Sequence, residues 1–374
     1  MAQAEQKEIV WFNAVRGIAA TEVCASHLRS FLFVNFAAVA RPTALVRVFY
    51  FATGLGHEAV VIFFVMSGWL VGGSVWRQQR DGRFSWRDYG TARLTRLWLV
   101  LIPALLWTEA VDHIGVSISG GYGYDGSQIG MSSSGPGNDA PLDLSMTAFA
   151  GNAFFLQTIL VPVLGTNGPL WSLAYEFWYY AVFPLFGWAW HRRGSWHTLG
   201  FAVAGAAILI SLPAAIQAGF VVWLLGWLAA LLFPRVRASA AMPLAFASLI
   251  LTIGLLVLFK HRPITGSAIY LGVAVAALLA GLRLLPNSTA LPWAQSAASH
   301  LAKISYTLYL FHFPLLALCF FSLHLAQRQP SAPVYGEFAS LLCAVLIVAT
   351  GLWYLFERRT ESVRRRVRKL WAPE

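Results

Sequence analysis

The sequence has 374 residues, of which 58% are hydrophobic and 11% are charged, and its formal net charge is +11. Soluble globular domains carry about a quarter charged residues, so this composition excludes that class and predicts a membrane protein. The positive charge does not indicate nucleic-acid binding, because the cations cluster in short segments between apolar runs, which is typical of cytoplasmic loops.

Apolar runs of about 20 residues, long enough to cross a bilayer as helices, recur along the whole chain. We therefore expect an all-α fold, a polytopic transmembrane bundle of about ten spans with both termini in the cytoplasm. This topology places 21 of the 27 Lys and Arg residues on the cytoplasmic side, as the positive-inside rule requires. The predicted spans are residues 11–34, 57–76, 97–114, 170–190, 197–214, 219–233, 241–259, 264–282, 301–325 and 335–356.

Two segments outside the spans are distinctive. Residues 115–145 are rich in Gly and Ser and predict an outer loop, either a solvated connector, which the composition favours, or a lid over a site. Residues 358–374 alternate cations with apolar side chains and predict a basic helix on the anionic cytoplasmic surface of the membrane. We therefore divide the chain into a transmembrane domain, residues 1–357, and this tail. No metal-binding motif occurs, and no permanently bound cofactor is expected.

The first span contains three ionisable side chains, Arg16, Glu22 and His27, although each is costly in hydrocarbon. Arg16 and His27 are eleven residues apart, which is three helical turns plus about 20°, so they share one stripe about 16 Å long. This stripe predicts the lining of a tunnel, because the residues between its ends are small: Ala19, Ala20 and Val23. Glu22 points to another face, and its spacing from Arg29 indicates a structural charge.

His27 has two interpretations. It can be a buried histidine whose hydrogen bonds a neighbouring helix satisfies, which is the usual case in soluble proteins. Inside a membrane, however, ionisable side chains are functional by default because their desolvation is costly. A buried neutral imidazole can accept a proton, which suits a general base acting on a hydroxyl.

Polar side chains in the second and third spans are further candidates. Ser67 and Gly68 lie in the middle of the second span, where such a pair allows close helix packing more often than it contacts a ligand. Arg93 and Arg96 lie one turn apart at the cytoplasmic end of the third span. They either bind phosphates or anchor the segment in the membrane surface, and their spacing alone favours anchoring.

The fourth and ninth spans also carry ionisable side chains. Glu176 lies about two turns into the fourth span, where it can orient His27 or contact an acceptor hydroxyl. The aromatic residues around it, Trp171 among them, are typical of an interfacial belt. In the ninth span His312 follows Tyr309 and is a second, weaker candidate imidazole.

Six segments occur in one order along nearly the whole chain. They are FNAVRGIAATEVCASHL, VIFFVMSGWLV, ARLTRLWLVLIP, GPLWSLAYEFWYYAVFP, ISYTLYLFHFPLL and the FER at residues 356–358. Each is weak alone, but together they resemble the acyltransferase 3 family of integral membrane O-acyltransferases. The resemblance implies transfer of an acyl group, usually acetyl, from cytoplasmic acyl-CoA to a hydroxyl of an extracytoplasmic or lipid-linked glycan or a glycosylated small molecule. It also implies a location in the plasma (inner) membrane, among membrane lipids.

The resemblance also implies roles for individual residues. His27 becomes the catalytic base or acyl carrier, Arg16 its essential partner, and Arg93 and Arg96 bind acyl-CoA together with Arg16. Glu176 becomes a third catalytic candidate, although the family pattern often has two adjacent carboxylates where this chain has one. The expected supporting residues around the substrate are Ser67, Trp171, Ser172, Tyr309 and His312.

The expected mechanism follows from the predicted topology. The arginines hold the CoA phosphates at the inner face, and the arm that carries the thioester lies along the small-residue stripe and reaches His27. The competing prediction is a transporter or exporter of a glycan or lipid, which would also place charges inside the membrane. Against it, the chain shows no duplicated halves and no paired helices broken by Gly or Pro.

Overall fold

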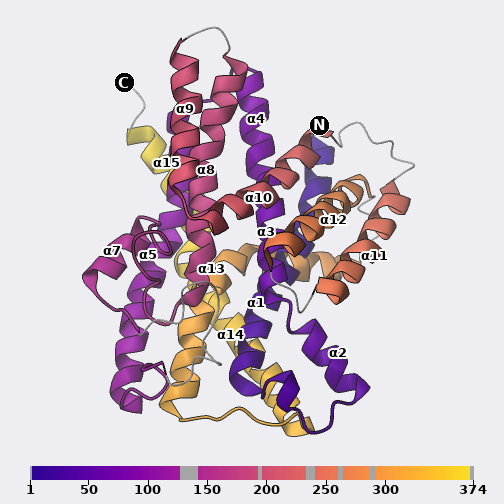
Figure 1. Cartoon of the computed structure of the whole chain (residues 1–374), viewed down its shortest axis with the longest axis vertical. Coiled ribbons are helices and arrows are strands. Elements are labelled where there is room, and N and C mark those ends of the chain that lie inside the picture. The colour runs from indigo at the N-terminus through magenta and orange to yellow at the C-terminus, as the bar shows by residue number, and fades with distance from the viewer. Residues whose placement is uncertain are drawn as a thin grey trace. The chain divides into compact units, whose positions relative to one another are not determined.

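The computed structural model describes residues 2–126, 142–192, 196–232, 241–259, 264–285 and 291–370. These residues are overwhelmingly helical and form no β-strand, which confirms the all-α fold (Figure 1). Two predicted segments lie partly outside the described residues, the Gly/Ser-rich segment at 127–141 and the tail at 371–374. The cations whose predicted side of the membrane also falls outside them are Arg193, Arg235, Arg237, Lys260 and Arg262.

Each predicted span overlaps a helix. The helices are α1 (Ala2–Leu32), α3 (Gly56–Ser67) continued by the π-helical turn η2 (Gly68–Gly72) and α4 (Gly73–Arg80), α5 (Trp86–Ser119), α8 (Trp171–His191), α9 (Trp196–Ser211), α10 (Ala214–Leu232), α11 (Ala241–Phe259), α12 (Ile264–Leu284), α13 (Pro292–Ser322) and α14 (Ala332–Leu355). Among the described residues, six stretches are long and apolar enough to cross a membrane: Ala44–Arg80, Trp86–Ser119, Ala214–Leu232, Met242–Phe259, Pro292–Ser322 and Ala332–Leu370. The chain is thus a multi-pass membrane protein, while the count of ten spans and the side of the termini stay predictions.

The helices outside this set of six differ from it in composition or length. Helix α1 carries Arg16, Glu22 and Arg29, and α8 carries Glu176 among polar aromatic residues, so both are less apolar than an ordinary span. The described apolar parts of α9 and α12 are short, Thr198–Ser211 and Ser267–Arg283. Both of these less apolar helices hold predicted site residues, His27 on α1 and Glu176 on α8.

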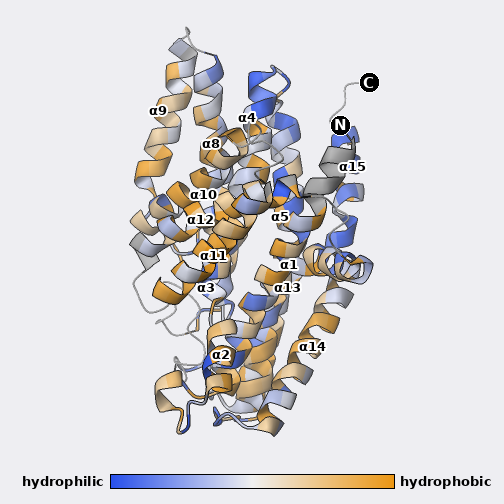
Figure 2. Cartoon of the chain, turned by 90° about the vertical axis from the view of Figure 1, so that its right-hand side faces the viewer, coloured by the Kyte–Doolittle hydropathy of each residue, from blue (hydrophilic) through white to orange (hydrophobic). Residues whose placement is uncertain are grey.

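Large apolar side chains are exposed along several helices. Phe246 and Leu258 on α11 are 65% and 68% exposed, and Ile347 on α14 is 71% exposed. Figure 2 shows apolar residues along most of α14 and hydrophilic residues along the C-terminal helix α15 (Thr360–Leu370). Because a soluble protein rarely exposes such extended apolar faces, we assign them to contact with lipid tails.

Several elements differ from the sequence-based expectation. Helix α5 begins at Trp86 rather than at residue 97 and continues to Ser119, inside the predicted loop. Two short helices were not predicted, α2 (Ala44–Ala52) and α7 (Met146–Ala153); each starts at a hydroxyl N-cap, Thr43 or Ser145, that accepts a backbone N–H. In the tail, the 3₁₀ turn η7 (Glu357–Arg359) leads into α15, which confirms that the tail is helical.

The chain divides into two compact units, and the first consists of Met1–Ala19, His57–Trp86 and Tyr175–Ala302. Its helices approach one another through glycines. A Cβ atom at Gly68 would lie 1.9 Å from the carbonyl oxygen of Trp223, and one at Gly226 would lie 1.9 Å from that of Val65. Gly68 therefore allows close helix packing, the more common of the two roles expected for the Ser67-Gly68 pair, while the role of Ser67 stays a prediction.

The second unit consists of Ala20–Gly56, Arg87–Ala174 and Lys303–Glu374. Its core contains the fully buried Phe31, whose ring contacts the rings of Phe320 and Phe321 on α13 at 5.2 and 5.6 Å. The Glu357 carboxylate of η7 accepts hydrogen bonds from the backbone N–H and the hydroxyl of Thr307, at 3.2 and 2.7 Å. These contacts make α13 the element around which this unit is packed.

Candidate active site

His27 in α1 and His312 in α13 form a hydrogen-bonded pair in the second unit. The two nitrogens, Nδ1 of His27 and Nε2 of His312, lie 2.8 Å apart. The ring planes are within 12° of parallel and the ring centroids are 5.1 Å apart, as a bond in the plane of both rings requires. Phe313 packs edge-on against His27 at 5.0 Å. Both imidazoles were predicted as site residues, and the structure brings them together.

The hydrogen-bond partners of His312 determine which nitrogens carry protons. Its Nδ1 lies 2.8 Å from the carbonyl oxygen of Leu308 and 3.0 Å from that of Tyr309. Carbonyl oxygens only accept, so Nδ1 of His312 is protonated and its Nε2 is the acceptor in the neutral ring. Nδ1 of His27 must then donate to it, which leaves the lone pair of the neutral His27 ring on Nε2. Among the described residues this nitrogen has no hydrogen-bond partner.

The two imidazoles differ in exposure. His312 is 1% exposed, whereas His27 keeps part of its surface accessible. His27 is therefore the member of the pair nearer the accessible surface, and His312 is enclosed behind it. The pair presents one basic nitrogen without a partner among the described residues, Nε2 of His27, supported by a second imidazole that is itself hydrogen-bonded to helix carbonyls.

Tyr309 and Ser172 connect α13 to the start of α8. Their hydroxyl oxygens are 2.7 Å apart, and the Tyr309 hydroxyl donates to the carbonyl oxygen of Pro169 at 3.0 Å. Pro169 lies in the 3₁₀ turn η3 (Gly168–Leu170), which leads directly into α8. Trp171 is only 5% exposed, so it belongs to the packed interior of the protein and not to an interfacial belt. These hydrogen bonds attach the segment of α13 that carries His312 to the start of α8.

Asp112 and Asn167 are buried polar residues near this turn that the sequence analysis missed. The Asp112 carboxylate accepts hydrogen bonds from the backbone N–H and the hydroxyl of Thr166, at 2.7 and 2.8 Å. The Asn167 amide donates to the Thr108 hydroxyl at 3.0 Å and to the carbonyl oxygen of Leu310 at 2.9 Å. An acid inside the apolar run of the third span was a visible signal, because intramembrane ionisable residues are rarely without a role.

Arg93 and Arg96 lie on α5, also in the second unit. The Arg93 guanidinium is 5.8 Å from the centre of the Tyr89 ring, in cation–π geometry, and the Arg96 side chain is exposed. The Nε atom of Arg93 is buried, both arginines have interaction partners within the protein, and their role in donor binding stays a prediction.

Ser67 and Glu176 belong to the first unit and are linked there through Tyr180. The Tyr180 hydroxyl donates a short hydrogen bond to the Glu176 carboxylate. It also lies 3.0 Å from the Ser67 hydroxyl, which accepts the indole N–H of Trp223 at 3.1 Å. Because the one proton of Tyr180 points to Glu176, Ser67 donates to Tyr180. Every proton in this network is directed toward the Glu176 carboxylate.

The stripe between Arg16 and His27 is closed. Arg16 is partly exposed, but the three small residues of the stripe are packed, since Ala19, Ala20 and Val23 are 2%, 1% and 2% exposed. The expectation of an open groove along α1 was therefore wrong. Helix spacing shows which residues share a stripe but not what packs against that stripe.

Glu22 has the structural role that its spacing indicated. Its carboxylate accepts the backbone N–H of Leu55 at 2.8 Å, and Arg29 donates from Nε to the carbonyl oxygen of Thr53 at 3.0 Å. Both side chains hold the turn between α2 and α3. Within the described part of the chain, no three His, Cys, Asp or Glu residues are placed to hold a metal ion.

Comparison with models of known protein families shows which family has this sequence pattern. The acyltransferase 3 family model, described as an acyltransferase domain, matches residues 9–358. The chain belongs to the acyltransferase 3 family. Membership across nearly the whole chain supports an acyltransferase and removes the basis for the transporter alternative. Searches of curated proteins and of solved structures gave no match for this acyltransferase.

Proposed function

We propose that this protein is a membrane O-acyltransferase that moves an acyl group, acetyl by family resemblance, from cytoplasmic acyl-CoA to an acceptor hydroxyl. The acceptor is an extracytoplasmic or lipid-linked glycan or a glycosylated small molecule, and the enzyme works in the plasma (inner) membrane. The observation that carries the proposal is the partly exposed His27, whose Nε2 lone pair is fixed by the hydrogen bond from its Nδ1 to His312. An acyl transfer to a hydroxyl needs one such base.

The reaction proceeds at Nε2 of His27. This nitrogen takes the proton of the acceptor hydroxyl while the hydroxyl oxygen attacks the thioester carbonyl carbon. The tetrahedral intermediate collapses, its C–S bond breaks, and the departing CoA thiolate takes the proton back from the imidazolium. The products are an ester and free CoA thiol, and His27 returns to its starting state.

His312 acts as a positioning residue in this scheme. When His27 becomes an imidazolium, its Nδ1–H bond to Nε2 of His312 becomes charge-assisted and therefore stronger. The carbonyl oxygens of Leu308 and Tyr309 keep His312 in the acceptor tautomer throughout. His312 thus orients His27 and fixes its tautomer, as the carboxylate of a catalytic triad does for its histidine.

A second route passes through the same atom. Nε2 of His27 attacks the thioester carbonyl carbon, CoA leaves, and the acyl-imidazole then acylates the hydroxyl. Acid quenching during turnover with labelled acetyl-CoA separates the routes. Label that stays on the peptide containing His27 supports the acyl carrier, and its absence supports direct transfer.

For the donor site we propose Arg16, Arg93 and Arg96 as ligands of the CoA phosphates, because guanidinium groups pair well with phosphates. The thioester arm does not follow the Ala19–Val23 stripe, since that stripe is packed. We expect Arg93→Gln combined with Arg96→Gln to weaken acyl-CoA binding by about tenfold or more per lost charge-assisted contact. Arg83→Gln, which replaces an arginine paired with Asp81 on an exposed turn, is the matched control. Equal affinity of the double variant and this control excludes the donor role.

For the acceptor site we propose the partly exposed carboxylate of Glu176, with Ser67 holding its Tyr180 partner in place. A carboxylate that already accepts one hydrogen bond has capacity left for an acceptor hydroxyl. Mass analysis of surface glycans from cells with and without the gene identifies the acylated molecule. Unchanged acylation of glycans and of glycosylated small molecules would exclude the proposed acceptor class.

The decisive test is transfer of label from acetyl-CoA by membranes that contain the protein. We expect His27→Ala to lose transfer by about 10²-fold or more, the contribution that a general base makes. His113→Ala replaces another histidine, 68% exposed on α5, and is the matched control. Protein level and gel-filtration profile are checked for both. Full transfer by His27→Ala would falsify the proposal.

A further inference from the structure

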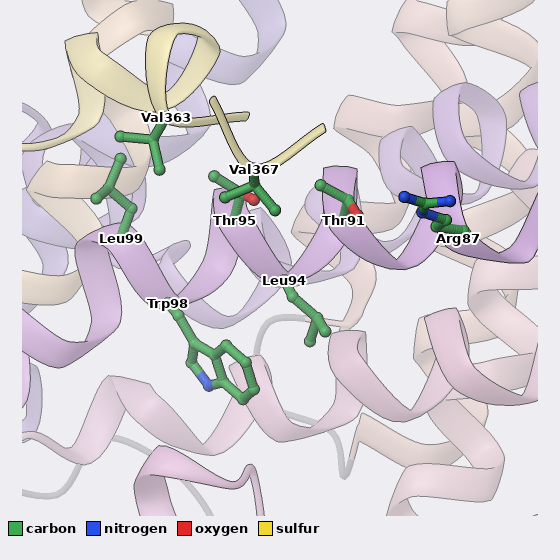
Figure 3. A pocket seen from close by; sticks show the side chains of 8 residues that line it. All are labelled: Arg87, Thr91, Leu94, Thr95, Trp98, Leu99, Val363 and Val367. Atoms are coloured by element: carbon green, nitrogen blue, oxygen red, sulfur yellow. The ribbon is translucent and has the colours of Figure 1, made fainter. Parts of the chain in front are cut away.

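A cavity of about 610 Å³ lies between α5 and the C-terminal helix α15, within the second unit. Figure 3 shows its lining residues, six from α5 and two from α15. They are Arg87, Thr91, Leu94, Thr95, Trp98, Leu99, Val363 and Val367. We call this cavity the α5–α15 groove. No role assigned above uses it.

The α5–α15 groove changes from polar to apolar along α5. Arg87 lies at one end, Thr91 and Thr95 follow, and Leu99 lies at the other end beside Val363, while Leu94 and Trp98 project from the other side of α5 in this view (Figure 3). The twelve-residue distance from Arg87 to Leu99 corresponds to about 18 Å of helix, close to the depth of one leaflet of a ~30 Å hydrocarbon core. A molecule with a polar head and a long apolar tail fits this gradient.

The positive charges around the groove favour an anionic headgroup over a neutral one. Five of the eleven residues of α15, TESVRRRVRKL, are cations and one is an acid, and Val363 and Val367 form its apolar face. An ion pair of 3.0 Å joins Arg368 to Asp88, beside Arg87, and holds α15 against α5 at this end. A basic amphipathic helix beside an arginine at the start of a span favours an anionic lipid headgroup.

The groove is separate from the proposed donor arginines. At 100° per residue, Arg93 and Arg96 lie about 120° and 180° around α5 from Arg87. The α5 residues of the groove extend from Leu94, about 20° on one side of Arg87, to Leu99, about 120° on the other side. Arg93 lies about 100° beyond Leu94 and Arg96 about 60° beyond Leu99, so neither lines the groove.

We propose that the α5–α15 groove binds one membrane phospholipid with an anionic headgroup. Its phosphate lies at Arg87, at the end of the groove where Arg368 pairs with Asp88, and an acyl chain lies along Leu94, Leu99 and Val363. The lipid clamps α15 to α5, and it is neither substrate nor product of acyl transfer.

Photoactivatable phosphatidylglycerol, carrying the reactive group on an acyl chain, tests this in phosphatidylcholine vesicles with the full-length protein. We expect labelled peptides from residues 94–99 and 363–367. A phosphatidylcholine probe should label these peptides about fivefold less, as one guanidinium contact to an anionic head implies. Arg87→Gln should lower phosphatidylglycerol labelling by about the same factor, and Leu94→Trp should abolish it by filling the groove.

The matched control is Arg366→Gln, which removes one charge from an exposed position of α15 that does not line the groove. Equal labelling loss in Arg87→Gln and Arg366→Gln means unspecific attraction and overturns the proposal. Equal labelling by both lipid probes, or competition by palmitoyl-CoA but not by phosphatidylglycerol, also overturns it. Acetyl transfer is measured on the same samples, so failure of the lipid site is recognised separately from failure of the enzymatic function.

Discussion

Two buried polar networks, one in each unit, direct their protons in opposite senses. In the His27–His312 network the protons point away from Nε2 of His27: His27 donates to His312, and His312 donates to helix carbonyls. In the Ser67–Glu176 network they point toward the end group: Trp223 donates to Ser67, Ser67 to Tyr180, and Tyr180 to Glu176. Both place ionisable groups in helices of a membrane protein.

This difference decides what each end group can do. A lone pair with no proton directed at it is available to take one, so Nε2 of His27 is suited to act as a base. A carboxylate that receives a chain of donors has its negative charge satisfied and is suited to hold a hydroxyl or to order the helices. Polar composition alone does not separate a base from a satisfied charge, but the direction of the protons does.

The largest loss of activity that tests this difference between the two networks is expected on substitution of His312. His312→Phe removes the acceptor for Nδ1–H of His27, so both tautomers of His27 become populated. We expect kcat to fall by about 30-fold, part of the 10²–10⁴ that general base catalysis contributes, with KM for acyl-CoA unchanged. His312→Gln keeps an amide oxygen where Nε2 was, and should retain at least about a third of the activity. Equal activity of the two variants would show that the Nδ1 contact has no positioning role.

An intermediate effect is expected at Glu176. Glu176→Gln removes the charge but keeps an oxygen that can accept the Tyr180 hydroxyl. Transfer should fall about fivefold through KM for the acceptor, because a neutral amide binds a hydroxyl less strongly than a carboxylate does. Steady-state kinetics with varied acceptor measures this. If the loss equals that of His27→Ala and lies in kcat, Glu176 takes part in proton transfer and the contrast is wrong.

The smallest effect on activity is expected at Tyr180. Tyr180→Phe breaks both hydrogen bonds that join Ser67 to Glu176. It should lower stability by about 1–3 kcal/mol while transfer changes less than twofold. Thermal inactivation in detergent gives the stability, with Tyr270→Phe, at a residue 62% exposed on α12, as control. A large loss of kcat at unchanged stability would place Tyr180 among the reacting groups.

Sequence reasoning recovered the helices and pointed separately to two side chains that the structure brings into contact. Apolar length predicted the helices, and the cost of ionisable groups in hydrocarbon drew attention to His27 and His312. It missed Asp112, although the same cost applied to an acid in the third span. It also predicted an open groove where Ala19 and Ala20 are packed, because a stripe on one helix does not show its partner.

By itself the sequence determined an all-α membrane protein, because only helices satisfy the backbone hydrogen bonds of such apolar runs in lipid. It also determined the family, through six ordered segments, and made His27 the candidate for the reacting side chain. The tertiary structure alone decided that His312 is the partner of His27 and that Nε2 is the basic nitrogen. The two residues are 285 positions apart, and a tautomer depends on the hydrogen-bond partner that packing brings to the ring.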